Sequence, residues 1–279
     1  MNQIKINRTI LAIGLVLSCG IALSVHVYMI QGLHIPGPDL ALLSKYWRYV
    51  SRYTSVLALM AFWLLTVRER KWSFIRQWLI LALVYCALNE SLRGAIMQGY
   101  CTNAIGYALL GNVPDYAEKF ILCALVVLAV SLPFRKRFIP LTALAISLIQ
   151  IFLLSPYLKK GWAPVMDALS DLAPKGEWCT LPYGPDLLIP AYATFIEAAV
   201  GCMFMAVLVW KYIPGPLWFR YAFFTLLIPT MRNIAVFTVV YPFVGKDTFA
   251  MNLAGIGQFT LEFMVLAFCS AYTVNRAMK

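Results

Sequence analysis

The chain alternates between long apolar stretches and short polar or charged segments. A helix that crosses a membrane needs about 20 mostly apolar residues to span a hydrocarbon layer of about 30 Å. The pattern predicts about eight such helices, with approximate bounds Thr9–Gln31, Tyr49–Val67, Phe74–Met97, Tyr116–Phe134, Phe138–Leu158, Leu187–Trp210, Leu217–Tyr241 and Phe249–Thr273. We therefore expect an all-α integral membrane protein.

The composition agrees with this interpretation. Apolar residues make up 62% and charged residues 13% of the 279 residues. In soluble domains, roughly 45–50% of the residues are apolar and about 25% are charged. The net charge of +11 lies in short clusters beside apolar stretches, as topology signals do, so we expect no nucleic-acid binding. The apolar stretch after Lys5 and Arg8 is long and has no clear small-residue cleavage site, so we interpret it as a retained helix rather than a signal peptide.

Basic residues near helix ends predict the orientation. With the N-terminus inside, the inner connections contain clusters around Arg68, Arg70 and Lys71 and around Arg135, and Glu69 is the only acidic residue there. Cytoplasmic connections carry an excess of Lys and Arg. The pattern therefore predicts a multi-pass protein of the cell inner membrane with both termini in the cytoplasm.

Two copies of a short motif indicate an internal duplication. The same four residues, Gly-Pro-Asp-Leu, occur at 37–40 and 184–187 before predicted helices. A gapless shift of 144 positions also pairs Arg76 with Arg220, Asn89 with Asn233, Gly111 with Gly255 and Glu118 with Glu262. The hypothesis is two parallel four-helix repeats, residues 1–137 and 138–279. For the motif alone, ordinary helix-start chemistry, with Pro in the first turn and Asp as a cap, explains it as well.

The repeat also matches two glycine-containing apolar segments, Ala104–Val113 and Thr248–Gly257. One interpretation is a pair of interfacial or re-entrant segments, with the last helix beginning nearer Thr260. The other is an ordinary apolar connection on the outer surface. Re-entrant backbone occurs only where it is buried in protein or lines water.

Polar and ionisable residues within the predicted spans are costly and mark candidate functional residues. The candidate ligand-binding residues are His26, Asn89, Glu90, Arg93, Glu118, Glu197, Arg232, Asn233 and Glu262. All of them fall in the outer half of the predicted spans or near the midplane, which indicates one polar cavity open to the outer side. Glu90 and Arg93, three residues apart, are expected to neutralise each other in part. The alternative is that such residues form buried pairs between helices, for example Glu90 with Arg232 or Glu197 with Arg93.

The remaining chemistry is sparse. Cys101 and Cys179 fall in two predicted outer connections, where oxidation is permitted, and we expect a disulfide between them. With only His26 and His34 and no Cys/His cluster, the sequence predicts no metal site, no haem and no other cofactor. Pro229 is expected to kink the seventh helix.

Three functional hypotheses fit these features. The first is binding or transport of a small or amphiphilic solute by the polar cavity. The second is a metal-free transferase or hydrolase that acts on a lipid-linked substrate, with a carboxylate such as Glu90 or Glu197 as the base and Arg93 or Arg232 holding a phosphate. The third is a non-catalytic assembly, anchor or immunity subunit with a protein partner. Membrane lipid is an expected partner in each case, and no catalytic residue is assigned.

Overall fold

The computed structural model describes residues 6–67, 70–132 and 136–278, and these residues form helices joined by short connections, with no strand among them. Four charged residues used in the sequence analysis, Lys5, Arg68, Glu69 and Arg135, lie outside this part of the chain. The chain falls into two compact units. Unit 1 contains residues 1–70 and 202–279, and unit 2 contains residues 71–201.

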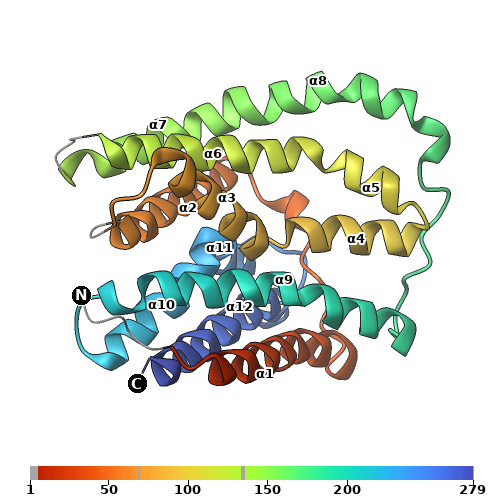
Figure 1. The fold of residues 1–279 in the computed structure, drawn as a ribbon. Coiled ribbons are helices and arrows are strands. Elements are labelled where there is room, and N and C mark those ends of the chain that lie inside the picture. The colour runs from red at the N-terminus through yellow and green to blue at the C-terminus, as the bar shows by residue number, and fades with distance from the viewer. Residues whose placement is uncertain (1–5, 68–69, 133–135, 279) are drawn as a thin grey trace. The chain divides into compact units, whose positions relative to one another are not determined.

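Unit 1 combines helices from both ends of the chain (Figure 1). It contains α1 (Arg8–Val27), prolonged by a π-helical turn (Tyr28–Gly32), α2 (Lys45–Val67), α10 (Leu217–Met231), α11 (Ala235–Val240) and α12 (Phe249–Ala277). Short 3-10 turns lie at Leu40–Leu42, Trp210–Tyr212 and Tyr241–Phe243. Large side chains of α2, α10 and α12 fill its interior, and Phe62, Trp63, Phe224 and Phe263 are fully buried there.

Unit 2 contains the middle of the chain. Its helices are α3 (Phe74–Leu88), α4 (Ser91–Thr102), α5 (Ile105–Gly111), α6 (Val113–Ser131), α7 (Ile139–Ile149) and α8 (Ser155–Ala168), with most of α9 (Pro185–Val209). A π-helical turn (Gln150–Leu154) joins α7 to α8, and 3-10 turns lie at Lys136–Phe138 and Ser170–Leu172. The helix α6 packs against α3 on one side and against α7 and α8 on another.

Several helices are long and apolar enough to cross a membrane. Five described segments meet this condition, namely Arg8–Gly32, Lys45–Val67, Ile139–Ala168, Pro185–Tyr212 and Phe249–Ala277. Two bent pairs, α3 with α4 and α10 with the segment Ala235–Phe243, raise the number to seven if each pair is one span. The expectation of an all-helical membrane protein is thus confirmed at the level of five to seven spans.

The structure breaks two of the predicted helices, and it extends the predicted fifth helix from Leu158 to Ala168. The predicted third helix is broken at Asn89–Glu90 and bends by 41°, and the predicted seventh is broken at Arg232–Ile234 and bends by 92°. A kink was expected at Pro229. The seventh helix bends at a break that begins three residues later, at Arg232. The alternative start of the last helix near Thr260 is wrong, because α12 begins at Phe249, after the Thr248 side chain accepts a hydrogen bond from the Met251 N–H (3.3 Å).

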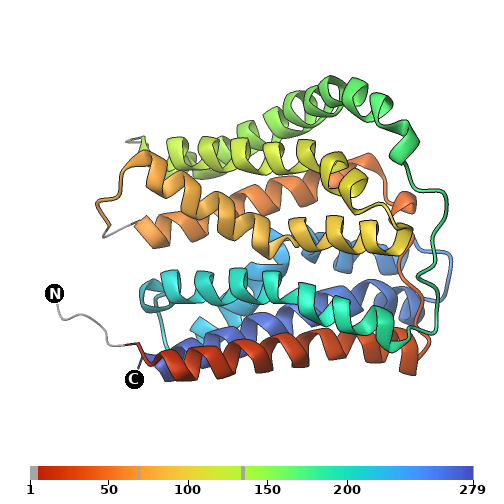
Figure 2. The ribbon, with the colours of Figure 1, turned by 45° about the vertical axis from the view of Figure 1, so that its right-hand side comes forward.

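Small residues allow α1 to lie closely along α12 in unit 1 (Figure 1 and Figure 2). The buried face of α1 includes Gly14, Ser18 and Ala22, a pattern typical of closely packed membrane helices. A Cβ atom at Gly14 would lie 2.1 Å from the Thr273 Cγ2 atom, whereas one at Gly20 on the same helix would meet nothing within 4 Å.

We therefore expect Gly14→Val to separate α1 from α12 and Gly20→Val to be tolerated. Overpacking of this kind destabilises proteins by about 1–3 kcal/mol. Thermal unfolding of the purified protein in detergent should show a lower midpoint for Gly14→Val and an unchanged or higher midpoint for Gly20→Val. Equal midpoints for the two variants would show that this contact does not limit stability.

Candidate functional site

The break between α3 and α4 exposes a helix terminus inside an apolar segment of unit 2. Asn89 ends α3, and its side-chain Nδ2 donates to the Tyr85 carbonyl (2.9 Å). Glu90 adopts the left-handed conformation (φ 51°) before α4 begins at Ser91. Because a non-glycine residue in this conformation costs roughly 1–2 kcal/mol, the surrounding contacts must hold it in place.

The carboxylate of Glu197, on α9, caps the beginning of α4. The Leu92 N–H donates to Glu197 Oε1 (3.1 Å), and the Arg93 N–H donates to Oε2 (2.6 Å). The first N–H groups of a helix have no partner within the helix, and they form the positive end of its dipole. Glu197 therefore satisfies two of these donors with the charge that the helix terminus favours.

The Arg93 side chain contacts Glu90 and Phe195. Its guanidinium forms an ion pair with Glu90, as the spacing predicted, and its Cζ lies 5.2 Å from the centre of the Phe195 ring. The Arg93 and Glu90 side chains are 21% and 12% exposed. Glu197 contacts Arg93 through the Arg93 backbone N–H, which is not the side-chain ion pair suggested as an alternative.

The first turns of α6 face the same helix terminus. The Lys119 Nζ donates to Ser91 Oγ (2.7 Å) and forms an ion pair with Asp115, and the Tyr116 hydroxyl donates to the Ser91 carbonyl (3.0 Å). Sequence reasoning did not single out Lys119, although its position next to Glu118 near the start of the predicted helix Tyr116–Phe134 was an available signal. We name this group the α4 cluster: Asn89, Glu90, Ser91, Arg93, Asp115, Tyr116, Lys119 and Glu197.

The break between α10 and α11 in unit 1 exposes the opposite kind of terminus. Arg232 ends α10, and Asn233 is left-handed (φ 63°). The Ser55 hydroxyl donates to the Met231 carbonyl (2.7 Å), and the Ser51 hydroxyl donates to the Asn233 carbonyl (2.6 Å). Both serines are buried on one face of α2, four residues apart, and this spacing was the signal that sequence reasoning overlooked.

Arg232 and His26 each contact α12. The Arg232 Cζ lies 3.5 Å from the centre of the Phe263 ring, in the geometry of a cation–π contact. The His26 Nδ1 lies 3.8 Å from Glu262 Oε2, and the His26 ring packs on Phe259 at 4.8 Å. We name this group the α10 cluster: His26, Ser51, Ser55, Arg232, Asn233 and Glu262.

The two glutamates that the sequence shift pairs have similar surroundings. Glu118 is 4% exposed and accepts a hydrogen bond from Gln150 Nε2 (2.7 Å), where the π-helical turn after α7 begins. Glu262 is 3% exposed and faces His26. His26 lies near the end of α1, just before the π-helical turn Tyr28–Gly32. Each buried carboxylate thus lies against a polar side chain at an irregular turn of a neighbouring helix, which is the kind of partner a buried charge requires.

The nine predicted ligand-binding residues divide between the units. Five lie in unit 2 (Asn89, Glu90, Arg93, Glu118 and Glu197) and four in unit 1 (His26, Arg232, Asn233 and Glu262). Two cavities lie elsewhere, and neither is lined by any of the nine. One, of about 520 Å³, lies in unit 2 between the end of α4 and residues 171–178, and the other, of about 650 Å³, lies between α2 and α10 in unit 1.

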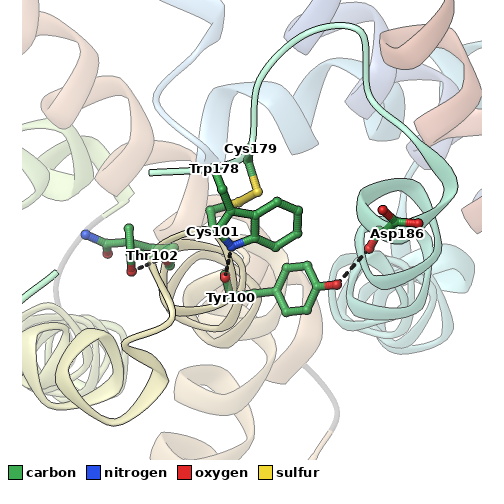
Figure 3. Close-up of a disulfide and its surroundings, with 7 residues drawn as sticks. Tyr100, Cys101, Thr102, Trp178, Cys179 and Asp186 are labelled. Atoms are coloured by element: carbon green, nitrogen blue, oxygen red, sulfur yellow. Dashed lines mark hydrogen bonds between the residues drawn. A yellow bond between two sulfur atoms is a disulfide. The ribbon is translucent and has the colours of Figure 1, made fainter. Parts of the chain in front are cut away.

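A disulfide joins Cys101 at the end of α4 to Cys179 in the connection before α9 (Figure 3). The neighbouring Trp178 donates from its indole Nε1 to the Tyr100 carbonyl (2.9 Å) and from its backbone N–H to the Cys101 carbonyl (3.0 Å). The Tyr100 hydroxyl in turn donates to the Asp186 carbonyl (2.9 Å). These contacts fix the long connection between α8 and α9 to the end of α4.

We expect Glu197→Gln to lower the thermal midpoint, because its amide NH₂ would face one of the two N–H donors of α4. A hydrogen bond to a charged group contributes about 1.5–3 kcal/mol to stability. Glu177→Gln, in the exposed connection before Cys179, is the matched control and should leave the midpoint unchanged. If Glu197→Gln behaved like this control, the cap of α4 would not require the charge.

The two clusters combine helix termini of opposite polarity with side chains of both charges, an arrangement that can bind polar or charged groups of a solute. Among residues 6–67, 70–132 and 136–278, no group of three or more His, Cys, Asp or Glu side chains is placed to hold a metal ion. No protein-family model matches the chain, and no curated protein or solved structure is significantly similar to it.

Proposed function

We propose that this chain is a multi-pass protein of the cell inner membrane that binds or transports a small or amphiphilic solute. In this proposal, eight spans form two parallel four-helix repeats, residues 1–137 and 138–279, with both termini in the cytoplasm. The solute is bound in a polar cavity that opens to the outer side, and its candidate residues belong to the α4 and α10 clusters. Their charged and amide side chains are the ligand-binding residues.

The disulfide supports the count of eight spans. Two cysteines can pair only on one side of a membrane, so the chain between Cys101 and Cys179 crosses it an even number of times. The segment Ile139–Ala168 is long and apolar enough for one crossing. The other crossing falls to α6, whose 19 residues extend about 28 Å at 1.5 Å per residue. The first turns of this helix contain three charged residues, Asp115, Glu118 and Lys119, which reduce its hydrophobicity.

The disulfide also supports the orientation. Disulfides persist in oxidising compartments and are rare in the cytosol, which supports a location of Cys101 and Cys179 on the outer side. Three spans precede Cys101 if α3 and α4 form one of them. With an odd number of crossings, the N-terminus would then lie in the cytoplasm, the side that the basic residues favour.

The two broken helices support the duplication. Both α3 and α10 contain 15 residues, and their first and last residues are each 143 positions apart, one fewer than the shift of 144 that pairs the sequences. Each ends at a break that contains a left-handed residue, Glu90 or Asn233. Glu118 on α6 and Glu262 on α12, paired by the sequence shift, are both buried against a polar side chain.

The observation that carries the functional proposal is the pair of helix breaks with charged residues at them. Interrupted helices at corresponding positions of two repeats mark the solute sites of many transporters, because half-helix termini supply N–H and carbonyl groups to a ligand. Broken backbone within a membrane is stable only where protein or a water-filled cavity surrounds it. A guanidinium group, that of Arg93 or that of Arg232, would hold an anionic group of the solute in a fixed geometry.

The orientation predicts that the disulfide forms in cells. After denaturation without reductant, a maleimide polymer should react with the five free cysteines, Cys19, Cys86, Cys123, Cys202 and Cys269, and after reduction with all seven. In the Cys101→Ser variant, six should react with or without reductant. Reaction of all seven native cysteines without reductant would contradict the assignment of these loops to the outer side.

The cavity predicts ligand-dependent stabilisation that needs both clusters. The purified protein would be heated with a panel of amino acids, carboxylates, sugar phosphates and lysophospholipids. A ligand at 100 times its dissociation constant stabilises a protein by about 2.7 kcal/mol, which raises the midpoint by several degrees. Glu90→Gln and Arg232→Gln should insert normally but lose this rise.

The control for these variants is Lys246→Gln, which removes a charge from a side chain that is 74% exposed. It should keep the stabilisation seen with the native chain. Stabilisation that survives in both Glu90→Gln and Arg232→Gln would contradict the site. Altered envelope lipid or glycan profiles in a deletion strain, without ligand-dependent stabilisation, would support a transferase or hydrolase in place of transport.

A further inference from the structure

A groove of about 650 Å³ runs between α2 and α10 in unit 1, and none of its lining residues belongs to the α4 or the α10 cluster. Aromatic side chains of α10, Trp218, Phe219 and Phe223, line one side of it. Alanines also line it, among them Ala61 on α2 and Ala222 on α10. Both helices belong to segments that are apolar enough to lie in the membrane.

The lining presents almost no polar atoms to an occupant. Two threonines lie at the end of the groove opposite Trp218, and each donates its hydroxyl to its own helix. The Thr54 hydroxyl donates to the Ser51 carbonyl (2.9 Å), and the Thr230 hydroxyl donates to the Leu226 carbonyl (2.8 Å). Both side chains can therefore turn their methyl groups to the groove, so its lining favours a hydrocarbon occupant.

The length of the groove fits one acyl chain. From Trp218 to Thr230, α10 rises about 18 Å at 1.5 Å per residue. One leaflet contributes half of a hydrocarbon layer of about 30 Å. A complete transmembrane helix of a partner protein would extend well beyond the groove, whereas an acyl chain of one leaflet fills it.

Basic residues gather where the groove begins. Arg220 lies one turn into α10, seven residues before the lining residue Leu227 and so on the same face of the helix. Lys211, in the turn before α10, is exposed, and Arg70 follows the end of α2. The described residues at this end of unit 1 include no acidic side chain. The exposed Trp218 ring lies there too, as tryptophans do at the membrane–water interface.

We propose that this groove is a binding site for one anionic glycerophospholipid of the cytoplasmic leaflet. One acyl chain lies between α2 and α10, and the phosphate lies at the Arg220 and Lys211 end. Anionic headgroups of that leaflet attract basic residues near the membrane surface, which gives the charge complementarity. The proposal uses the orientation inferred above, but it requires neither the polar cavity nor solute transport.

The test measures lipid retained by the purified chain. The protein is delipidated in detergent, incubated with phosphatidylglycerol or phosphatidylcholine, and examined by native mass spectrometry and thermal unfolding. One phosphatidylglycerol should remain bound per chain and raise the midpoint, and phosphatidylcholine should bind at least fivefold more weakly. Arg220→Gln should reduce phosphatidylglycerol affinity about fivefold, the contribution expected of one basic residue.

Two further variants separate the groove from general effects. Ala222→Trp fills the groove at an exposed position, so the chain should fold, with an unchanged midpoint without lipid, and lose the bound phosphatidylglycerol. Arg276→Gln removes a basic residue from the exposed end of α12 and should retain the lipid. Equal retention of both lipids, retention by Ala222→Trp, or a stoichiometric protein in place of lipid would overturn the proposal. Loss of solute stabilisation in Glu90→Gln would not affect it.

Discussion

Backbone N–H and carbonyl groups must have partners inside a membrane, and this constraint governs both helix breaks of the chain. The structure meets it in opposite ways. At the beginning of α4, the two oxygens of Glu197 accept the N–H groups of Leu92 and Arg93. At the end of α10, the hydroxyl groups of Ser51 and Ser55 donate to backbone carbonyls. A carboxylate suits the positive end of a helix, and a neutral donor suits the negative end.

The same constraint explains why charged residues gather at the breaks. Once Glu197 introduces a negative charge beside α4, Arg93 and Lys119 offset it, and Glu90 and Asp115 pair with them. Under the proposed repeat, unit 1 takes α1 and α2 from residues 1–137 and α10 to α12 from residues 138–279, and unit 2 takes α3 to α6 from the first copy and α7, α8 and most of α9 from the second. Each unit would then be stabilised by contacts between the two copies, so neither copy could fold as a separate bundle.

The sequence predicted the apolar segments and the polar residues better than the details of their arrangement. Hydrophobic run length identified the membrane helices because a long helix in lipid needs little else. The break at Asn89–Glu90 was not predictable, because no proline or glycine marks it and the Glu197 cap that supports it lies more than 100 positions away in the sequence.

The start of α12 was uncertain because Gly255 suggested a turn. It serves close packing instead, since a Cβ there would lie 2.9 Å from the Pro36 carbonyl oxygen. The ion pair of Glu90 with Arg93 was predictable because it depends only on local spacing.

The bond between Cys101 and Cys179 has a consequence for biogenesis. The two cysteines are 78 positions apart, and α5, α6, α7 and α8 lie between them. Under the proposed topology, Cys101 reaches the oxidising side early in synthesis, and Cys179 follows only after the translocon has released α6 to α8 into the bilayer. The disulfide can therefore form only after α6 to α8 have been inserted into the membrane. A chain that stops before this insertion would keep both cysteines as free thiols.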